Sequence, residues 1–181
     1  MKLVLIDRDG VINEEIKNGY VKSPAELAIY PAALFAFKLF KENGFVCVVI
    51  TNQSVVGRGI IDLKMLHNIH EFMSDAVSQS GGKIEEIFFC TDHPDKTTYR
   101  RKPNPGMLIE ALEKYKADPA KTAFIGDAIT DMQAAESAGC QRYMVLTGKG
   151  SEEKNKIPDA LRPVIVCTDI LDAAKKIIEA S

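Results

Sequence analysis

The sequence contains 181 residues, of which 46% are hydrophobic and 27% are charged, and its formal net charge is −2. This length predicts a single domain spanning residues 1–181, and the balanced charge argues against a broad basic surface for nucleic acid. No apolar stretch approaches the roughly 20 residues that cross a membrane, and no signal pattern opens the chain, so we expect no membrane partner and a cytoplasmic location. The four cysteines are scattered through apolar segments, which favours reduced thiols over a disulfide framework.

Short apolar runs alternate with segments of helical periodicity along the whole chain. The predicted strands are residues 3–6, 45–50, 84–90, 122–125, 143–146 and 164–167. The predicted helices are residues 32–43, 63–80 after a cap at Asp62, 105–115, 132–138, and a last helix capped by Asp169. This alternation predicts an α/β fold, a Rossmann-like three-layer sandwich with helices on both faces of a parallel sheet. Residues 14–30 are an irregular connection that could form a flap over a site, and residues 147–162 are expected to be a loose, charged stretch.

The first strand ends abruptly in Asp7-Arg8-Asp9-Gly10. Ligands of open parallel sheets bind at the carboxyl ends of the strands, because the loops that leave the strands line a crevice there. Two carboxylates one residue apart can converge on one cation or one phosphate, so that one attacks while the other handles protons. Taken alone the pair is weak evidence, because Asp and Gly are common wherever a strand turns.

Three further polar groups follow predicted strands or precede a predicted helix. Thr51-Asn-Gln-Ser54 and Gly57-Arg-Gly59 follow the second strand and are a plausible phosphate cradle. Lys102 is held by neighbouring prolines at the start of a helix, where anions are favoured. Asp127 and Asp131 follow the fourth strand and form a second acidic pair. Carboxylates gathered at strand ends repel one another unless a cation is present, and Mg²⁺ suits such an oxygen-rich site.

Each of these groups also has an ordinary structural interpretation. Asp131 could cap the following helix, Thr51 could form a turn, and Lys102 could belong to a solvated basic face with Arg100 and Arg101. The joint placement at strand ends and helix starts is what favours a site for phosphoryl chemistry. Cys90 and His93 have the spacing of half a zinc site without the other half, so a buried thiol and a loop histidine are expected. His67 and His70 are expected to have surface or packing roles.

Taken together, the ordered motifs resemble those of the haloacid dehalogenase superfamily of phosphatases. More narrowly they are similar to its heptose-bisphosphate and histidinol-phosphate phosphatases. The matching segments are Asp7-Arg-Asp-Gly-Val-Ile-Asn13, Gly19-Tyr20-Val21, Thr51-Asn-Gln-Ser54 followed by Gly57-Arg-Gly59, Arg101-Lys-Pro-Asn-Pro-Gly-Met107 and Gly126-Asp-Ala-Ile-Thr-Asp131. The gaps in which other members carry large cap domains are short here, so the resemblance implies a hydrolase domain without a large cap.

The resemblance also assigns roles to individual residues. It implies that Asp7 is the nucleophile that forms an aspartyl-phosphate and that Asp9 is the general acid and base. It places Mg²⁺ on Asp7, the backbone carbonyl of Asp9 and Asp127, with Asp131 in support. Phosphoryl oxygens would be held by Thr51, Asn52 and Lys102, and the rest of the substrate by Arg8, Gly19, Tyr20, Gln53, Ser54, Arg58 and Arg101.

Two positions depart from the family pattern. Heptose phosphatases typically carry a structural zinc site with a cysteine pair just before Arg-Lys-Pro, and this chain has Thr98 and Arg100 at those positions. We therefore predict that the structural zinc is absent. Many relatives have a lysine directly after the fourth-motif aspartate, where this chain has Ala128. Both changes bear on the substrate and leave the core catalytic set intact.

The resemblance implies a Mg²⁺-dependent phosphomonoesterase for a small phosphorylated sugar, with the 7-phosphate of a heptose 1,7-bisphosphate as the first choice, and we expect the protein to be a monomer. Histidinol-phosphate phosphatase and polynucleotide 3′-phosphatase are rivals within the same class, and the balanced charge argues against the second. A rival from another class is a non-catalytic protein that binds a phosphorylated ligand. It would bind a sugar phosphate without releasing phosphate when Mg²⁺ is present.

Overall fold

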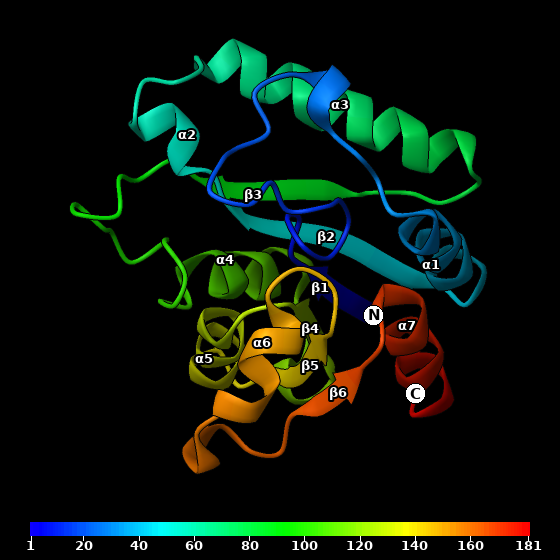
Figure 1. The fold of residues 1–181 in the computed structure, drawn as a ribbon. Coiled ribbons are helices and arrows are strands. Elements are labelled where there is room, and N and C mark those ends of the chain that lie inside the picture. The colour runs from blue at the N-terminus through cyan, green and yellow to red at the C-terminus, as the bar shows by residue number, and fades with distance from the viewer.

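The computed structural model describes residues 1–181 and contains a six-stranded sheet in the order β3-β2-β1-β4-β5-β6 (Figure 1). All neighbouring strands are parallel. The strands are β1 Lys2–Ile6, β2 Phe45–Asn52, β3 Glu86–Cys90, β4 Ala123–Gly126, β5 Gln141–Val145 and β6 Ile165–Cys167. The predicted α/β class and parallel sheet are confirmed.

Helices cover both faces of the sheet, as the alternation of elements predicts (Figure 1). They are α1 Pro31–Glu42, α2 Ser54–Gly57, α3 Leu63–Gln79, α4 Gly106–Tyr115, α5 Ile129–Ser137, α6 Gly150–Glu153 and α7 Ile170–Glu179. Val4 and Ile6 of β1 pack in a core with α1, α3 and α7, whereas Leu3 and Leu5 pack with α4 and α5. Successive strand residues point to opposite faces, so a strand that is apolar throughout is buried between two helical layers. None of the helices combines the length and the apolar character needed to cross a membrane.

Local sequence signals fix several of the helix boundaries. The carboxylates of Asp62 and Asp169 accept hydrogen bonds from backbone N–H groups in the first turns of α3 and α7, which confirms both predicted caps. α1 begins at Pro31, and the chain leaves it through Gly44, whose φ is 76°.

Two expectations about the second half of the chain were wrong. α5 begins at Ile129, so Asp131 lies in the first turn of the helix and not before it. Residues 147–162 are not loose: they contain α6 and the 3-10 turns Lys154–Lys156 and Asp159–Leu161. Ile157 and Leu161 are buried against α5 and β5 in a small apolar cluster. That burial orders a segment whose charged composition suggested otherwise.

The strand order reverses at β1, and this reversal sets the position of the candidate site. The chain passes from β1 to β2 and β3 on one side and then returns to β4, β5 and β6 on the other. The ends of β1 and β4 therefore meet where the strand order reverses, which is where open α/β sheets bind ligands. The connections after β1 and after β3 hold no helix longer than the 3-10 turn Pro24–Glu26 and no named strand. No large cap covers this end of the sheet.

Candidate active site

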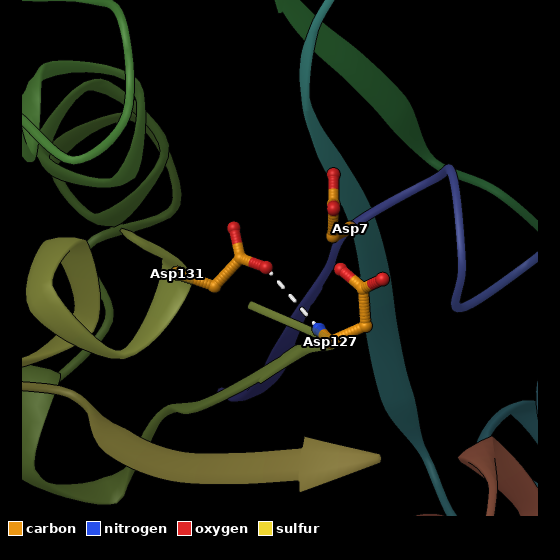
Figure 2. A group of neighbouring side chains, drawn as sticks. All are labelled: Asp7, Asp127 and Asp131. Atoms are coloured by element: carbon orange, nitrogen blue, oxygen red, sulfur yellow. Dashed lines mark hydrogen bonds between the residues drawn. The ribbon is translucent and has the colours of Figure 1, made fainter. Parts of the chain in front are cut away.

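Three buried carboxylates meet at the carboxyl ends of the central strands (Figure 2). Asp7 follows β1, Asp127 follows β4, and Asp131 projects from the first turn of α5. Each of them offers one carboxylate oxygen, and these three oxygens all lie within 4.8 Å of one another. Residues far apart in the sequence thus form one acidic cluster, which we define as Asp7, Asp127 and Asp131.

Lys102 is inserted into the acidic cluster. Its Nζ lies 2.7 Å from Asp7 Oδ1 and 2.7 Å from Asp131 Oδ1, and it donates to the Ile50 carbonyl at 3.1 Å. Asn52, at the end of β2, holds the backbone of Lys102: its Nδ2 donates to the Lys102 carbonyl at 3.0 Å and its Oδ1 accepts from the Lys102 N–H at 3.1 Å. The lysine is therefore fixed to the neighbouring strand rather than by the start of α4, which begins at Gly106.

The remaining carboxylate oxygens of the cluster have different partners. Asp131 Oδ2 accepts from the backbone N–H of Asp127 at 3.2 Å (Figure 2). It also accepts from the backbone N–H of Ala128 at 3.1 Å. Asp127 Oδ2 accepts from the backbone N–H of Lys149 at 2.8 Å. Asp7 Oδ2 and Asp127 Oδ1 make no hydrogen bond with the protein. The cluster thus presents two oxygens free to bind something else, while Asp131 is fully occupied in holding the others.

The electrostatics of the cluster favour a bound cation. Burial, with the nearby Asp131 charge, raises the pKa of Asp7 to about 7 although Lys102 opposes the shift. Burial, Asp131 and Asp7 together raise the pKa of Asp127 to about 8. Burial also disfavours the charge on Lys102, but Asp131 and Asp7 outweigh it and raise the pKa of the ammonium group. One lysine cannot neutralise three carboxylates, so the residues fit a divalent cation with oxygen ligands such as Mg²⁺.

Asp9 has a different environment, although it is only two residues from Asp7. Arg8 Nη2 donates to both of its carboxylate oxygens at 2.9 Å, Asn13 Nδ2 donates to Oδ1 at 3.0 Å, and Gln53 Nε2 donates to Oδ2 at 2.8 Å. Burial acts to raise the pKa of Asp9, but the Arg8 charge and these hydrogen bonds hold it below its usual value. We define Arg8, Asn13 and Gln53 as the Asp9 clamp.

The loop after β5, which was predicted only to be part of a loose, charged stretch, closes the other side of the site. The Thr147 hydroxyl donates to the Gly10 carbonyl at 2.6 Å, which brings this loop beside the turn after β1 (Figure 1). Gly10 has a φ of 83°, and a Cβ there would lie 2.1 Å from Asp127 Oδ2. The signal was available in Thr147-Gly-Lys-Gly150, which directly follows a predicted strand.

A cavity of about 340 Å³ opens over the cluster and the clamp. Eight of the ten predicted substrate-binding residues line it: Arg8, Gly19, Tyr20, Thr51, Asn52, Gln53, Arg101 and Lys102. Ser54 and Arg58 do not: Ser54 is buried, and Arg58 is exposed with its guanidinium carbon 6.0 Å from the centre of the Tyr20 ring. The irregular 14–30 connection borders the cavity, as expected of a flap. Glu15, Ile16, Val21, Ala128, Thr130 and Lys149 also line the cavity and were not predicted.

Several predicted contacts are already made with protein groups. The Arg8 side chain is buried against Asp9, and both polar atoms of the Asn52 side chain bind the backbone of Lys102. Direct contacts of these two side chains with substrate stay predictions. Thr51 Oγ1 accepts from Gln53 Nε2 at 2.9 Å and faces the cavity.

The loop before Lys102 is held by polar contacts. The backbone N–H of Thr98 donates to Asp92 Oδ2 at 2.6 Å, and Arg100 Nε donates to Glu110 at 2.8 Å. Cys90 is buried, as predicted, and His93 lies 3.4 Å from a carboxylate oxygen of Asp95. The absence of a structural zinc stays a prediction.

Comparison with known proteins identifies the family. The chain belongs to the haloacid dehalogenase superfamily of hydrolases, as the relatives described next show over most of its length, and a HAD-hydrolase-like family model matches residues 99–173. The D-glycero-beta-D-manno-heptose-1,7-bisphosphate 7-phosphatase of Bordetella bronchiseptica is 36% identical over 181 residues, which is 99% of each chain. The enzyme of that name from Pseudomonas aeruginosa is 38% identical over 148 residues, or 82% of this chain and 83% of the relative.

A solved structure agrees with the sequence relatives. The crystal structure of the B. bronchiseptica D,D-heptose 1,7-bisphosphate phosphatase, complexed with magnesium and phosphate, matches with a TM-score of 0.94 over 100% of both chains. The identity in that match is 36%. The resemblance inferred from the sequence motifs is confirmed.

Proposed function

We propose that this protein is a Mg²⁺-dependent phosphomonoesterase that removes the 7-phosphate of D-glycero-D-manno-heptose 1,7-bisphosphate. The observation that carries the proposal is the match to a relative of that activity over 99% of both chains. The acidic cluster with its two free oxygens supplies the chemistry that this reaction needs.

In the proposed reaction Asp7 is the nucleophile. A carboxylate oxygen of Asp7 attacks phosphorus, the bond from phosphorus to the sugar oxygen breaks, and an aspartyl-phosphate forms. Asp7 Oδ1 is engaged by Lys102 at 2.7 Å, whereas Oδ2 is free, so Oδ2 is the attacking atom. Lys102 and Thr51 face the same cavity and hold the phosphoryl oxygens, whose negative charge the ammonium group stabilises.

Mg²⁺ would be held by Asp7, Asp127 and the backbone carbonyl of Asp9, with Asp131 orienting the site through its bonds to the Asp127 and Ala128 N–H groups. When bound, the cation neutralises the carboxylates and stabilises the charge of the transferring phosphoryl group. The free oxygen of Asp127 is a fitting ligand, and Asp7 would supply the oxygen that does not attack phosphorus.

Asp9 is the proposed general acid and base. It gives a proton to the leaving sugar oxygen and then takes one from the water that attacks the aspartyl-phosphate, which releases inorganic phosphate and restores Asp7. Its side chain is 30% exposed, whereas that of Lys102 is 3% exposed, so Asp9 can reach a leaving group and water in the cavity.

The test is phosphate release with Mg²⁺ from both anomers of the heptose 1,7-bisphosphate, histidinol phosphate and a 3′-phosphorylated oligonucleotide. We expect a preference for a heptose bisphosphate that disappears in Asp7→Asn. If the protein prefers another ester, the proposed substrate is wrong. If it binds a sugar phosphate without releasing phosphate, it is a binding protein and not an enzyme.

The proposal includes a monomeric protein that acts in the cytoplasm. All four cysteines are free and buried, which fits a reducing compartment. Light scattering during gel filtration checks the oligomeric state, and cell fractionation checks the location.

A further inference from the structure

His70 is a buried polar residue that the proposed reaction does not use. It lies in the middle of α3 and is only 5% exposed. Its Nε2 is 3.4 Å from Nη1 of Arg8, a residue 62 positions away at the end of β1. His67, one helical turn earlier, is exposed on the same helix. The two histidines have a common aromatic neighbour, because the rings of His67 and His70 pack on Phe89 with centroids 5.7 Å and 5.5 Å apart.

The direction of the hydrogen bond follows from the chemistry of arginine. A guanidinium group has only donors, so His70 Nε2 must be the acceptor and the ring proton must sit on Nδ1. A doubly protonated ring could not accept the bond and would place a second positive charge beside Arg8. Burial, followed by the Arg8 charge, lowers the pKa of His70 to about 3, so the ring is neutral at physiological pH.

The guanidinium of Arg8 has few other partners. Its side chain is 1% exposed, Nη2 is bound to both oxygens of Asp9, and Nε is buried without a partner. His70 is thus the one side-chain acceptor other than Asp9 that the guanidinium has. An unpaired buried donor is costly, so without His70 the guanidinium would be expected to shift toward another acceptor or water.

A shift of Arg8 would disturb Asp9, because a single guanidinium nitrogen bridges both of its oxygens. We propose that His70 is a positioning residue that orients Arg8 and thereby fixes the carboxylate of Asp9 for proton transfer to the leaving group. This inference rests on the proposed function, in which Asp9 is the general acid. His70 does not line the cavity, and its side-chain hydrogen bond is to Arg8.

The experiment uses two kinds of phosphate ester. A sugar phosphate has a poor leaving group that needs a proton from Asp9, whereas p-nitrophenyl phosphate releases a stable phenolate that needs little help. The ratio kcat/KM reports only the steps up to release of the first product, so later hydrolysis of the aspartyl-phosphate does not obscure it. A general loss of structure would lower both values equally.

We expect His70→Leu to lower kcat/KM for the sugar phosphate by about tenfold, with KM nearly constant, and to change the value for p-nitrophenyl phosphate by less than about twofold. His70→Gln, which keeps an acceptor, should recover most of the loss. His67→Leu, which removes the other histidine on Phe89, should leave both substrates unaffected. Equal losses on both esters, or no rescue by glutamine, would overturn the inference.

A second measurement needs no turnover. In ¹⁵N spectra of ring-labelled histidines at pH 7, the signals lost in His70→Gln should be those of a neutral ring with its proton on Nδ1. A proton on Nε2, or a charged ring, would rule out the bond to Arg8. A wild type that hydrolyses no ester would refute the proposed function, whereas an active wild type with equal losses in His70→Leu would refute only the role of His70.

Discussion

The acidic cluster and the Asp9 clamp lie side by side, yet they shift the pKa of the neighbouring carboxyl groups in opposite directions. Burial among other carboxylates raises the pKa of Asp7 to about 7, whereas Arg8, Asn13 and Gln53 hold the pKa of Asp9 below its usual value in spite of burial. The cluster is incomplete without a cation, whereas both oxygens of the Asp9 carboxylate accept hydrogen bonds from protein groups. The difference shows that the environment, rather than the residue type, sets the pKa of each of two neighbouring aspartates.

The largest expected effects are those of replacing Asp7 and Asp9, and the two variants should differ in how strongly the loss of activity depends on the leaving group. Asp7→Asn removes the nucleophile, so turnover of both a sugar phosphate and p-nitrophenyl phosphate should fall at least about a thousandfold. Asp9→Asn should lower kcat/KM for the sugar phosphate by roughly a hundredfold or more and that for p-nitrophenyl phosphate far less. Steady-state kinetics on both esters checks this, with thermal unfolding to confirm the fold. If Asp9→Asn damaged both esters equally, the assigned division of roles would be wrong.

Mg²⁺ should stabilise the folded protein through the side chains of the acidic cluster and not through the side chain of Asp9. At a Mg²⁺ concentration of 100 times its dissociation constant, the free energy of unfolding should rise by about 2.7 kcal/mol. At the same concentration Asp127→Asn should gain much less, because it loses a carboxylate ligand. Asp9→Asn is the matched control and should gain as much as the wild type, since only its backbone carbonyl is a proposed ligand. Urea unfolding with and without EDTA measures each gain, and a wild type indifferent to Mg²⁺ would contradict the site.

The pH dependence of stability should reveal the raised pKa values of the cluster in the metal-free protein. The carboxyls of Asp7 and Asp127 titrate at about 7 and about 8 when folded, above the 3.8 of an ordinary aspartate. The folded state therefore binds more protons than the unfolded state between these values, and stability falls as pH rises, by up to about 1.4 kcal/mol per pH unit for each proton.

Comparison with Asp127→Asn isolates the contribution of Asp127, because groups that titrate alike in both proteins cancel in the difference. In EDTA, the stability of the wild type relative to the variant should decrease from pH 5 to pH 8. Bound Mg²⁺ should remove much of that slope. If the two curves of stability against pH are parallel in EDTA, the pKa of Asp127 is not raised in the folded protein.

The smallest expected effect concerns Gln53, which could contact substrate or hold Asp9. Its Nε2 donates to Asp9 and to Thr51 at the same time. Because those bonds are made to protein, Gln53→Leu should lower kcat for the sugar phosphate by a few-fold, up to about tenfold, with little change in KM. A rise in KM at constant kcat would instead support the substrate contact predicted from the sequence.

The fold class and the members of the acidic cluster can be inferred from the amino-acid sequence alone. Continuous apolar runs specify strands buried on both faces, and Asp7, Lys102, Asp127 and Asp131 follow strands or precede a helix, so local chemistry revealed them. The signals for α3 and α7 were equally local, since the capping carboxylates of Asp62 and Asp169 bind N–H groups only three residues away.

The partner of each polar side chain, in contrast, depends on how distant segments meet in the folded protein. The contacts of Arg8 with His70, of Asn52 with Lys102 and of Lys149 with Asp127 span 62, 50 and 22 residues, and no sequence periodicity encodes them. The ordering of residues 147–162 likewise came from burial of two apolar side chains against distant elements. Pairing of buried polar groups and packing of the core are decided by which segments meet in space, and local sequence does not specify that.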